Sequence, residues 1–496
     1  MKKPGMLFCC MILSGLISGS LVAQEPAVIK IDTDRKIGEI NPNIYSSFIE
    51  PLYDIVYGRL YDPSSPLTDE NGFRKDLIQM TRELKVPVIR WHGGNYVSGY
   101  NWKDGIGPKD QRPVRMELAW NAVDKNQMGT DEYARFCNLI GAENFVCINA
   151  GTGNVDDARH WVEYCNVEKG TYYSDLRRKY GNEKPYNVKY WALGNEIDGS
   201  WQMGYKNVED YSKFALEAAK LMEWTDKNIK LIASGASDYN ADNRWIDWNE
   251  YVLQHLIGHI DYISVHRYVE RGDNFAEFMA MGRDLDQKIG IVKGQIEKTL
   301  VKSGSKRPVY ISFDEWSGGG DDLSASLMVA QHLNAFIRNA DIVKMANFTL
   351  LTTLIGYSPD GDFKNALYHS FYLFSNNCVG NALSVYTNCE KYNTKLFNDV
   401  PYLDVTAVFN EAEKMLIVNI VNRHETKIIP TDIILQTGEF MGDAVVNEVN
   451  GKSITAKNTN KEQNVSTNTK ELKVKGNTIH YEFPAHSFTQ LMLQIK

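Results

Sequence analysis

The regular alternation of short apolar segments with longer amphipathic ones is the feature that most restricts how this chain can fold. Apolar segments of strand length occupy residues 44–50, 87–93, 144–150, 189–196, 230–237, 262–268, 308–316 and 344–354. The segments between them carry apolar residues at three- and four-residue spacing, as in Tyr211, Phe214, Ala215, Ala218 and Met222, which is typical of helices. Eight strands alternating with helices over about 340 residues predict a (β/α)8 barrel with enlarged loops.

A change of pattern near residue 381 predicts a second domain. Beyond it, apolar residues alternate with period two in short segments such as 405–409, 415–421, 428–435 and 488–495. We therefore expect the barrel over residues 40–380 and a β-sandwich over residues 381–496. The alternating segment 24–39 is expected to add one or more strands to that sandwich. The Asn-, Thr- and Lys-rich segment 456–470 is expected to be an exposed loop.

Residues 1–23 have the composition of a secretory signal peptide. Lys2 and Lys3 give a positive start, residues 6–16 are apolar, and residues 21–23 form a typical cleavage site before Gln24. The apolar segment is short for a membrane span and is interrupted by Ser14, Gly15, Ser18 and Gly19, so no membrane span is expected. The sequence predicts export to the periplasm or the extracellular space.

Composition argues against several classes of protein. The chain is 43% hydrophobic and 23% charged with a net charge of −8, which is typical of a soluble globular protein and unsuited to nucleic-acid binding. The five cysteines that remain beyond residue 23 are scattered without CxxC spacing, so neither a disulfide framework nor a zinc site is expected. The sequence contains neither HExxH nor a phosphate-binding loop ending in GK[ST]. We therefore expect no metal and no cofactor.

Two of the predicted strands end in a glutamate. Catalytic groups of a (β/α)8 barrel come from the C-terminal ends of its strands. The fourth strand ends at Glu196, after Trp-Ala-Leu-Gly-Asn, and the seventh ends near Glu315, within Phe-Asp-Glu-Trp. Glycoside hydrolysis needs one acid to protonate the leaving oxygen and one carboxylate to act on the anomeric carbon. We therefore predict a retaining glycoside hydrolase with Glu196 as general acid/base and Glu315 as nucleophile.

Other side chains are expected around the same mouth of the barrel. Those at the ends of the first, second and sixth strands are Glu50, Arg90, Asn95, His266 and Tyr268. A histidine such as His266 is by itself more often a core residue, but this combination of groups favours a role in the site. Trp102 and Trp316 are candidates for stacking on a sugar ring, with packing in the core or at the rim as the alternative for each.

Several motifs follow one another along the predicted barrel. They are Gly-Gly-Asn at 93–95, Gly-Tyr-Asn-Trp-Lys-Asp-Gly-Ile-Gly-Pro at 99–108, Asn-Gln-Met-Gly-Thr-Asp-Glu at 126–132, Trp-Val-Glu-Tyr-Cys-Asn at 161–166, Gly-Asn-Glu-Ile-Asp-Gly at 194–199, the pair His266 and Tyr268, and Asp-Glu-Trp at 314–316. In this order they resemble glycoside hydrolase family 51. That family is dominated by retaining α-L-arabinofuranosidases built as a (β/α)8 barrel plus a β-sandwich, often assembled as homohexamers.

The resemblance implies an activity and a set of roles. It implies release of L-arabinofuranose from α-linked side chains of arabinan or arabinoxylan, which are plant cell-wall polysaccharides, or from arabino-oligosaccharides. It also implies a homo-oligomer. Arg90 is implied to lie beneath the nucleophile and help keep it ionised. The residues implied to contact the sugar or to position the carboxylates are Glu50, Asn95, Asn195, His266 and Tyr268.

The sequence departs from the family pattern at two places. His92 stands where the family has a proline before the Gly-Gly-Asn motif. Asn365 stands where the family places a glutamine near the bound sugar. Both residues are expected at the mouth of the pocket, where they would affect substrate preference and not reaction class.

Two alternative functions stay open at this stage. Another retaining barrel glycosidase, such as a β-glucanase or a β-xylosidase, would keep both glutamates and differ in the shape of the pocket. A noncatalytic carbohydrate-binding protein would use the barrel as a scaffold and would have no reason to keep the carboxylate pair. The intact pair favours an enzyme.

Overall fold

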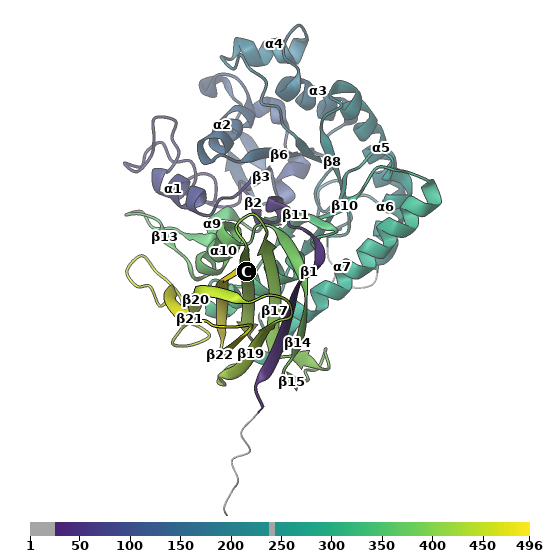
Figure 1. Ribbon diagram of the computed structural model, residues 1–496. Helices are drawn as coiled ribbons and strands as arrows, with labels where there is room; N and C mark the ends of the chain where they lie inside the picture. Colours follow the sequence, from purple (N-terminus) through teal and green to yellow (C-terminus); the bar gives the residue numbers. More distant parts are fainter. Residues whose placement is uncertain (1–24, 238–243) are drawn as a thin grey trace, which may run out of the picture.

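The computed structural model describes residues 25–237 and 244–496, so the predicted signal peptide lies outside the described residues. Eight parallel strands close into a barrel in the order β2-β3-β6-β7-β8-β9-β10-β11 (Figure 1). Their bounds are β2 (Ser46–Phe48), β3 (Val88–Trp91), β6 (Glu143–Cys147), β7 (Tyr190–Ala192), β8 (Lys230–Ser234), β9 (Tyr262–Arg267), β10 (Tyr310–Trp316) and β11 (Val343–Phe348). Each strand overlaps one predicted apolar segment, which confirms the (β/α)8 prediction.

Helices surround the barrel, and most of them bury an apolar face. They are α1 (Lys75–Glu83), α2 (Thr130–Ile140), α3 (Val155–Asn166), α4 (Tyr172–Lys179), α5 (Val208–Thr225), α6 (Arg244–Leu256), α7 (Phe275–Ser303), α8 (Leu323–Arg338), α9 (Leu351–Leu354) and α10 (Ala366–Asn377). Helix α5 shows why they form where they do. The side chain of Asn207 accepts a hydrogen bond from the backbone of Asp210 and caps its start, while Tyr211, Ala215 and Met222 fall on one buried face.

The enlarged loops lie mainly after β3 and after β11. The loop after β3 contains the short 3-10 helices η2 (Asn95–Gly99), η3 (Trp102–Gly105) and η4 (Lys109–Gln111) and the hairpin of β4 (Arg115–Glu117) and β5 (Ala122–Asp124). The loop after β11 contains α9 and the hairpin of β12 (Ile355–Gly356) and β13 (Phe363–Lys364). A further 3-10 helix, η1 (Pro42–Tyr45), precedes β2.

A nine-stranded sheet forms the C-terminal domain, in the order β21-β20-β23-β18-β17-β14-β1-β19-β22. Its strands are β1 (Ala27–Glu39), β14 (Asn381–Asn388), β17 (Leu403–Asn410), β18 (Met415–Asn422), β19 (Ile429–Leu435), β20 (Phe440–Gly451), β21 (Val465–Lys473), β22 (Thr478–Phe483) and β23 (Ser487–Ile495), with the small pair β15 (Lys391–Tyr392) and β16 (Val400–Pro401) beside it. The N-terminal strand β1 pairs with β14 and β19 and runs beside the C-terminal strands in Figure 1.

The sheet is continuous, yet it encloses a core as a sandwich does. Ile433 of β19 and Phe483 of β22, at one end of the strand order, share a single buried cluster with Val446 of β20 and Leu491 of β23. The sheet therefore curls so that its two ends face one another. The β-rich C-terminal domain is as predicted, but its strands form one hydrogen-bonded order and not two separate sheets.

Part of the segment 456–470 is a strand and not the exposed loop expected from its composition. Residues 465–470 belong to β21, the last strand in the order, which pairs with β20 alone. Most of its side chains are partly or fully exposed. An edge strand tolerates Asn, Thr and Lys because its side chains remain largely in water, which is why composition alone misled the prediction.

Helix α8 joins the two domains. All side chains from Leu323 to Ile337 are buried, because one face of α8 packs on the barrel and the other on the sheet. Val408, Ile417 and Phe488 point from the sheet into the same core as the barrel residues. The five cysteines among the described residues are free thiols. No helix in the described part of the chain is long and apolar enough to cross a membrane.

Candidate active site

A small pocket opens at the C-terminal ends of the barrel strands. It measures about 160 Å³ and contains both predicted catalytic glutamates. Its lining residues are Phe48, Glu50, Leu52, Gly94, Asn95, Trp120, Glu196, Tyr268, Glu315, Thr349 and Leu350. Two larger hollows, of about 250 and 300 Å³, share the loop 99–101, and neither is lined by Glu196 or Glu315. The smaller pocket is therefore the candidate active site.

Glu315 lies near the end of β10 in a buried set of hydrogen-bond donors. Arg90 Nη1 donates to its Oε1 at 3.0 Å, as does the backbone N–H of Gly94 at 3.2 Å. The hydroxyl of Tyr268 donates to Oε2 at 2.6 Å. Burial raises the pKa of Glu315, but the charges of His266 and Arg90 and the hydrogen bonds outweigh burial and hold that pKa below its usual range. Glu315 is thus a buried, ionised carboxylate.

Glu196 faces this carboxylate from the loop that follows β7. Its Oε1 bonds to Nδ1 of His266 at 2.9 Å, and its Oε2 accepts a hydrogen bond from Trp201 Nε1 at 3.0 Å. Glu196 has a φ of 45°, in the left-handed region, and follows Gly194 at φ 113°. This turn directs the carboxylate back across the barrel mouth.

His266 lies between the two carboxylates. Its Nδ1 is 2.9 Å from Glu196 and 3.7 Å from Oε2 of Glu315. Burial lowers the pKa of His266, but the negative charges of Glu315 and Glu196 and the hydrogen bond to Glu196 raise it above its ordinary value. One oxygen of each carboxylate and the ring nitrogen all lie within 4.8 Å of one another. Glu196 bonds to His266 and Trp201, and Glu315 bonds to Tyr268, so the cluster is a hydrogen-bonded set of acidic and basic groups.

Asn195 occupies the position just before Glu196. Its Oδ1 accepts a hydrogen bond from Arg90 Nη2, and Gln202 fixes its backbone carbonyl at 2.6 Å. Its Nδ2 is buried and has no hydrogen-bond partner among the described residues. A buried, unpaired donor costs free energy. Asn195 itself is not among the residues that line the pocket, although its neighbour Glu196 is.

Glu50 is the third carboxylate of the pocket. Its Oε1 accepts hydrogen bonds from the backbone N–H of Tyr96 at 3.1 Å and from Trp120 Nε1 at 2.8 Å. Burial and the charge of Glu315 raise the pKa of Glu50 to about 8. Glu50 is therefore a protonated acid at neutral pH. Gly94 allows this packing, since a Cβ there would lie 2.0 Å from a carboxylate oxygen of Glu50 and its φ is +72°.

Three predicted sugar contacts lie elsewhere, and each is a correction. Trp316 is fully buried against His332 and Phe348, because alternate residues of a barrel strand point outward into the helix layer. Asn365 caps the start of α10 and donates to the carbonyl of Thr353. Neither residue lines the pocket.

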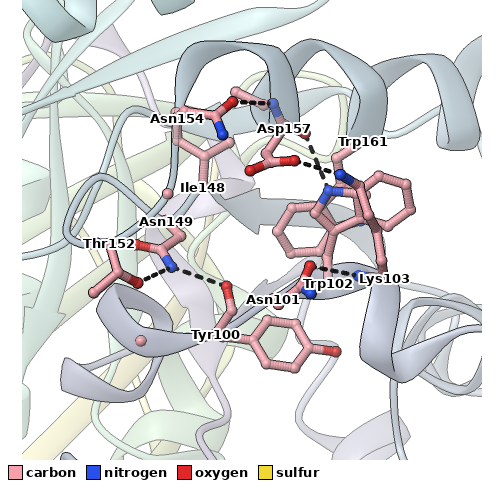
Figure 2. A pocket seen from close by; sticks show the side chains of 13 residues that line it. Tyr100, Asn101, Trp102, Lys103, Ile148, Asn149, Thr152, Asn154, Asp157 and Trp161 are labelled. Atoms are coloured by element: carbon pink, nitrogen blue, oxygen red, sulfur yellow. Dashed lines mark hydrogen bonds and ion pairs between the residues drawn. The ribbon is translucent and has the colours of Figure 1, made fainter.

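Trp102 is the third of these corrections. It stacks on Trp161 with ring centroids 5.8 Å apart, and its indole N–H donates to the carbonyl of Asp157 (Figure 2). It lines the hollow of about 250 Å³ beside α3 and not the pocket with the glutamates. Trp102 therefore packs within the long loop after β3, which was the alternative to stacking on a sugar ring.

His92 is buried beneath the site and not at the mouth of the pocket, where it was expected. Its ring packs among Trp91, Tyr96 and Tyr100. Burial alone holds the pKa of His92 well below its usual value. Asn347, near the end of β11, is likewise fully buried, whereas Thr349 and Leu350 after that strand line the pocket.

The structure also adds residues that the sequence did not reveal. Trp120 reaches Glu50 from the turn between β4 and β5, and Trp201 reaches Glu196 from the loop after β7. Phe48 and Thr349 complete the lining. The closeness of Trp201 to Glu196 in the sequence was a usable signal for that residue. Nothing local indicated Trp120, which lies 70 residues from its partner.

Comparisons with known proteins agree across both domains. A family model described as the α-L-arabinofuranosidase 1 domain matches residues 80–279, and one described as the α-L-arabinofuranosidase C-terminal domain matches residues 317–487. A Bacillus subtilis protein named intracellular exo-α-(1→5)-L-arabinofuranosidase 1 is 36% identical, covering 91% of this chain and 96% of its own length. An Aspergillus clavatus protein named "Probable alpha-L-arabinofuranosidase C" is 38% identical, covering 95% and 98%.

The fold comparison gives the same result. The solved structure of a thermostable GH51 α-L-arabinofuranosidase from Thermotoga petrophila is 34% identical, with a TM-score of 0.87, and covers 94% of this chain and 99% of the other. The matches therefore include the barrel and the C-terminal sheet. On this evidence the chain belongs to the α-L-arabinofuranosidases of glycoside hydrolase family 51.

Proposed function

We propose that the protein removes terminal L-arabinofuranose from α-linked side chains of arabinan, arabinoxylan or arabino-oligosaccharides with retention of configuration. The observation that carries this proposal is the pair Glu196 and Glu315, which have oxygens within 4.8 Å of one another and unlike surroundings. Carboxyl groups of retaining glycosidases lie about 5–5.5 Å apart, whereas inverting enzymes separate theirs by about 6.5–9.5 Å to admit a water.

In the first step of the proposed mechanism, Glu315 attacks the anomeric carbon. Burial raises the pKa of Glu315, but the charges of His266 and Arg90 lower it further than burial raises it. Glu315 is therefore ionised and able to attack. Glu196 donates a proton to the glycosidic oxygen as the bond to the leaving group breaks. The products of this step are the free alcohol and an arabinosyl ester of Glu315.

In the second step, Glu196 takes a proton from water, and the resulting nucleophile attacks the anomeric carbon from the side that the leaving group vacated. The ester bond breaks and Glu315 leaves as a carboxylate. Two inversions give net retention. His266, which bonds to Glu196, is suited to steady that carboxylate through both proton transfers.

The pocket supports removal of single terminal sugars. Ligand pockets for drug-sized molecules measure about 300–1,000 Å³, and this pocket of about 160 Å³ has room for one ring and not for a chain. Glu50 and Asn95, which line the pocket, supply an acid and an amide for the hydroxyls of that ring, and Asn195 beside Glu196 has a buried, unpaired N–H.

A panel of nitrophenyl glycosides tests the proposal. We expect the highest kcat/KM on the α-L-arabinofuranoside, with much lower values on the β-xyloside and the β-glucoside. Proton NMR of the reaction should show the retained anomer first. A higher kcat/KM on either β-glycoside would instead favour a β-xylosidase or a β-glucanase on the same scaffold.

We also propose that the protein is exported and forms a homohexamer. Export is supported by Lys2, Lys3 and the apolar residues 6–16, although the Bacillus subtilis relative is named intracellular. N-terminal sequencing of cell-derived protein should find a start at or near Gln24, and an intact Met1 would contradict export. The hexamer is supported by family membership, and light scattering of the purified protein tests it.

A further inference from the structure

Arg90 contacts three different groups with the three edges of its guanidinium. Nη1 donates to Glu315 at 3.0 Å, and Nη2 donates to Asn195. Nε faces Oδ2 of Asp314 at 3.8 Å and has no hydrogen-bond partner among the described residues. One arginine therefore connects the nucleophile, the residue before the acid/base and a third, separate carboxylate.

Asp314 is a buried carboxylate that lies outside the pocket. Its side chain is 1% exposed, and it is not among the residues that line the pocket. It precedes Glu315 at a register shift in β10 between Phe313 and Glu315, and both carboxylates lie within reach of the guanidinium of Arg90. The hydroxyl of Ser312 donates to Oδ1. Oδ2 has no hydrogen-bond partner in the described part of the chain, which leaves the guanidinium of Arg90 as its charged partner.

We propose that Asp314 is a positioning residue that anchors the Nε edge of Arg90 and shares the positive charge of that arginine with Glu315. The inference rests on the proposed function, because it concerns how the nucleophile of that reaction is held. Removing Asp314 would free Arg90 from one of its two carboxylate partners and direct its full charge at the nucleophile.

Several groups from other elements surround Asp314 and interact with it electrostatically. They are Arg90 of β3, Cys147 of β6, Tyr211 of α5, and Ser264 and His266 of β9, with Ser312 and Glu315 on its own strand. Burial raises the pKa of Asp314, while Arg90, the serine hydroxyls and His266 oppose burial. The pKa of Cys147 is raised to about 12, so this thiol is neutral. Arg90 is the fixed cation of the set.

The test compares pH profiles of wild type, Asp314→Asn and Ser312→Ala on nitrophenyl α-L-arabinofuranoside. In Asp314→Asn the negative charge beside Arg90 is gone, so the acidic limb of kcat/KM, which reports ionisation of Glu315, should move to lower pH by about half a unit to one unit. Asp314→Asn should also lose activity, because the Nε edge of Arg90 is no longer anchored. This loss should appear in kcat more than in KM, since Asp314 does not line the pocket. Ser312→Ala removes the hydroxyl that donates to Oδ1 of Asp314 and so makes the charged form of Asp314 less stable. It should move the acidic limb of kcat/KM in the same direction, but by less.

Asp404→Asn is the matched control. Asp404 is also buried and paired with arginines, at 2.9 Å from Arg338 and 3.1 Å from Arg423, but it lies in the C-terminal sheet. This variant should lose thermal stability and keep the wild-type acidic limb. The inference is overturned if Asp314→Asn lowers kcat/KM equally at every pH, or if its limb and kcat match wild type. If Asp314→Asn does not fold, the inference is overturned when the acidic limb of kcat/KM in Ser312→Ala lies at the same pH as in wild type. If wild type itself does not cleave the arabinofuranoside, the proposed function is what fails.

Discussion

The barrel mouth and the junction between barrel and sheet both bury arginine–carboxylate pairs, but they satisfy them differently. At the junction, Asp404 accepts from Arg338 at 2.9 Å and from Asn334 at 2.9 Å, and pairs with Arg423 at 3.1 Å. Arg423 also donates from Nε to Gln331 at 2.6 Å. Every buried polar atom of this group has a partner. A saturated network of this kind holds two domains together and offers nothing to a ligand.

The barrel mouth leaves polar atoms without a hydrogen bond, although Arg90 and Asp314 form an ion pair at 3.8 Å. Nδ2 of Asn195, Nε of Arg90 and Oδ2 of Asp314 are buried without a hydrogen bond to any described residue. Such atoms cost free energy in a folded protein. The difference between the regions distinguishes structural from functional burial of charge: the junction stabilises the fold, whereas the mouth gives up stability to keep groups available.

The two regions should also respond to pH with opposite signs. The arginines beside Asp404 outweigh its burial and hold its pKa below the usual range, so its contribution to stability is present above that range and is lost as pH falls through the folded-state pKa. The pKa of Glu50 is raised to about 8. Its unfolded form ionises first, so Glu50 costs stability as pH rises from about 4.3 toward 8.

The largest expected effect is that of Glu315→Ala at the mouth. Loss of the nucleophile should abolish turnover of every substrate, by more than the roughly 10²–10⁴-fold that general acid catalysis supplies. Kinetics on nitrophenyl and alkyl arabinofuranosides check this. The unfolding temperature should also fall, because the buried Arg90 loses one of its carboxylate partners. Residual activity close to that of wild type would contradict the nucleophile assignment.

Glu196→Ala should give the next largest effect, and one that depends on the leaving group. Alkyl arabinofuranosides should lose about 10²–10⁴-fold in kcat/KM, whereas nitrophenolate departs without protonation and should lose less. Azide should restore turnover of the nitrophenyl substrate with retained configuration, since a small anion replaces base-activated water. In Glu315→Ala any azide product should be inverted. An equal loss on both classes of substrate would argue against the acid role.

Asp404→Asn should show the reverse pattern at the junction. Removing one partner of a buried ion pair typically costs about 3–5 kcal/mol, because Arg338 and Arg423 lose their shared carboxylate. Chemical denaturation measures this loss, and kcat/KM per folded molecule should stay at the wild-type value. A loss of activity without a loss of stability would show that the junction is coupled to the site.

Glu50→Gln should change the pH dependence of the mouth. Ionisation of Glu50 near pH 8 places a second negative charge beside Glu315, so the wild-type kcat/KM should fall on the basic side near that pH. The glutamine variant should lack this limb. Its stability should also fall less than that of wild type between pH 5 and pH 8. A basic limb unchanged in Glu50→Gln would assign it to another group.

Asn365→Ala should have the smallest effect. Because Asn365 caps α10 and lies outside the pocket, its loss should cost about 1 kcal/mol of stability, within the usual range of roughly 0.5–2 kcal/mol for a helix cap. KM for the arabinofuranoside should not change. A raised KM at unchanged stability would restore Asn365 as a sugar contact.

Local sequence was sufficient to predict the scaffold and the strand-end groups. Period and segment length gave the eight barrel strands, and the rule that catalytic groups end barrel strands led to Glu50, Asn95, Glu196 and Glu315, all of which line the pocket. Prediction from local sequence failed where the orientation of a side chain decided its role. Trp316 ends a strand as Glu315 does, yet it points into the helix layer because successive strand residues face opposite sides.

What the sequence by itself determined is therefore the order of elements, the fold class and the chemical types of the groups at the strand ends, since these depend on periodicity and on neighbours in the chain. Tertiary structure alone decided which groups meet. Arg90 contacts Glu315 across 225 residues, and Trp120 contacts Glu50 across 70. Burial, pairing and the resulting pKa values depend on such distant contacts, because an electrostatic interaction is set by distance in space and by the exclusion of water, neither of which a local pattern encodes.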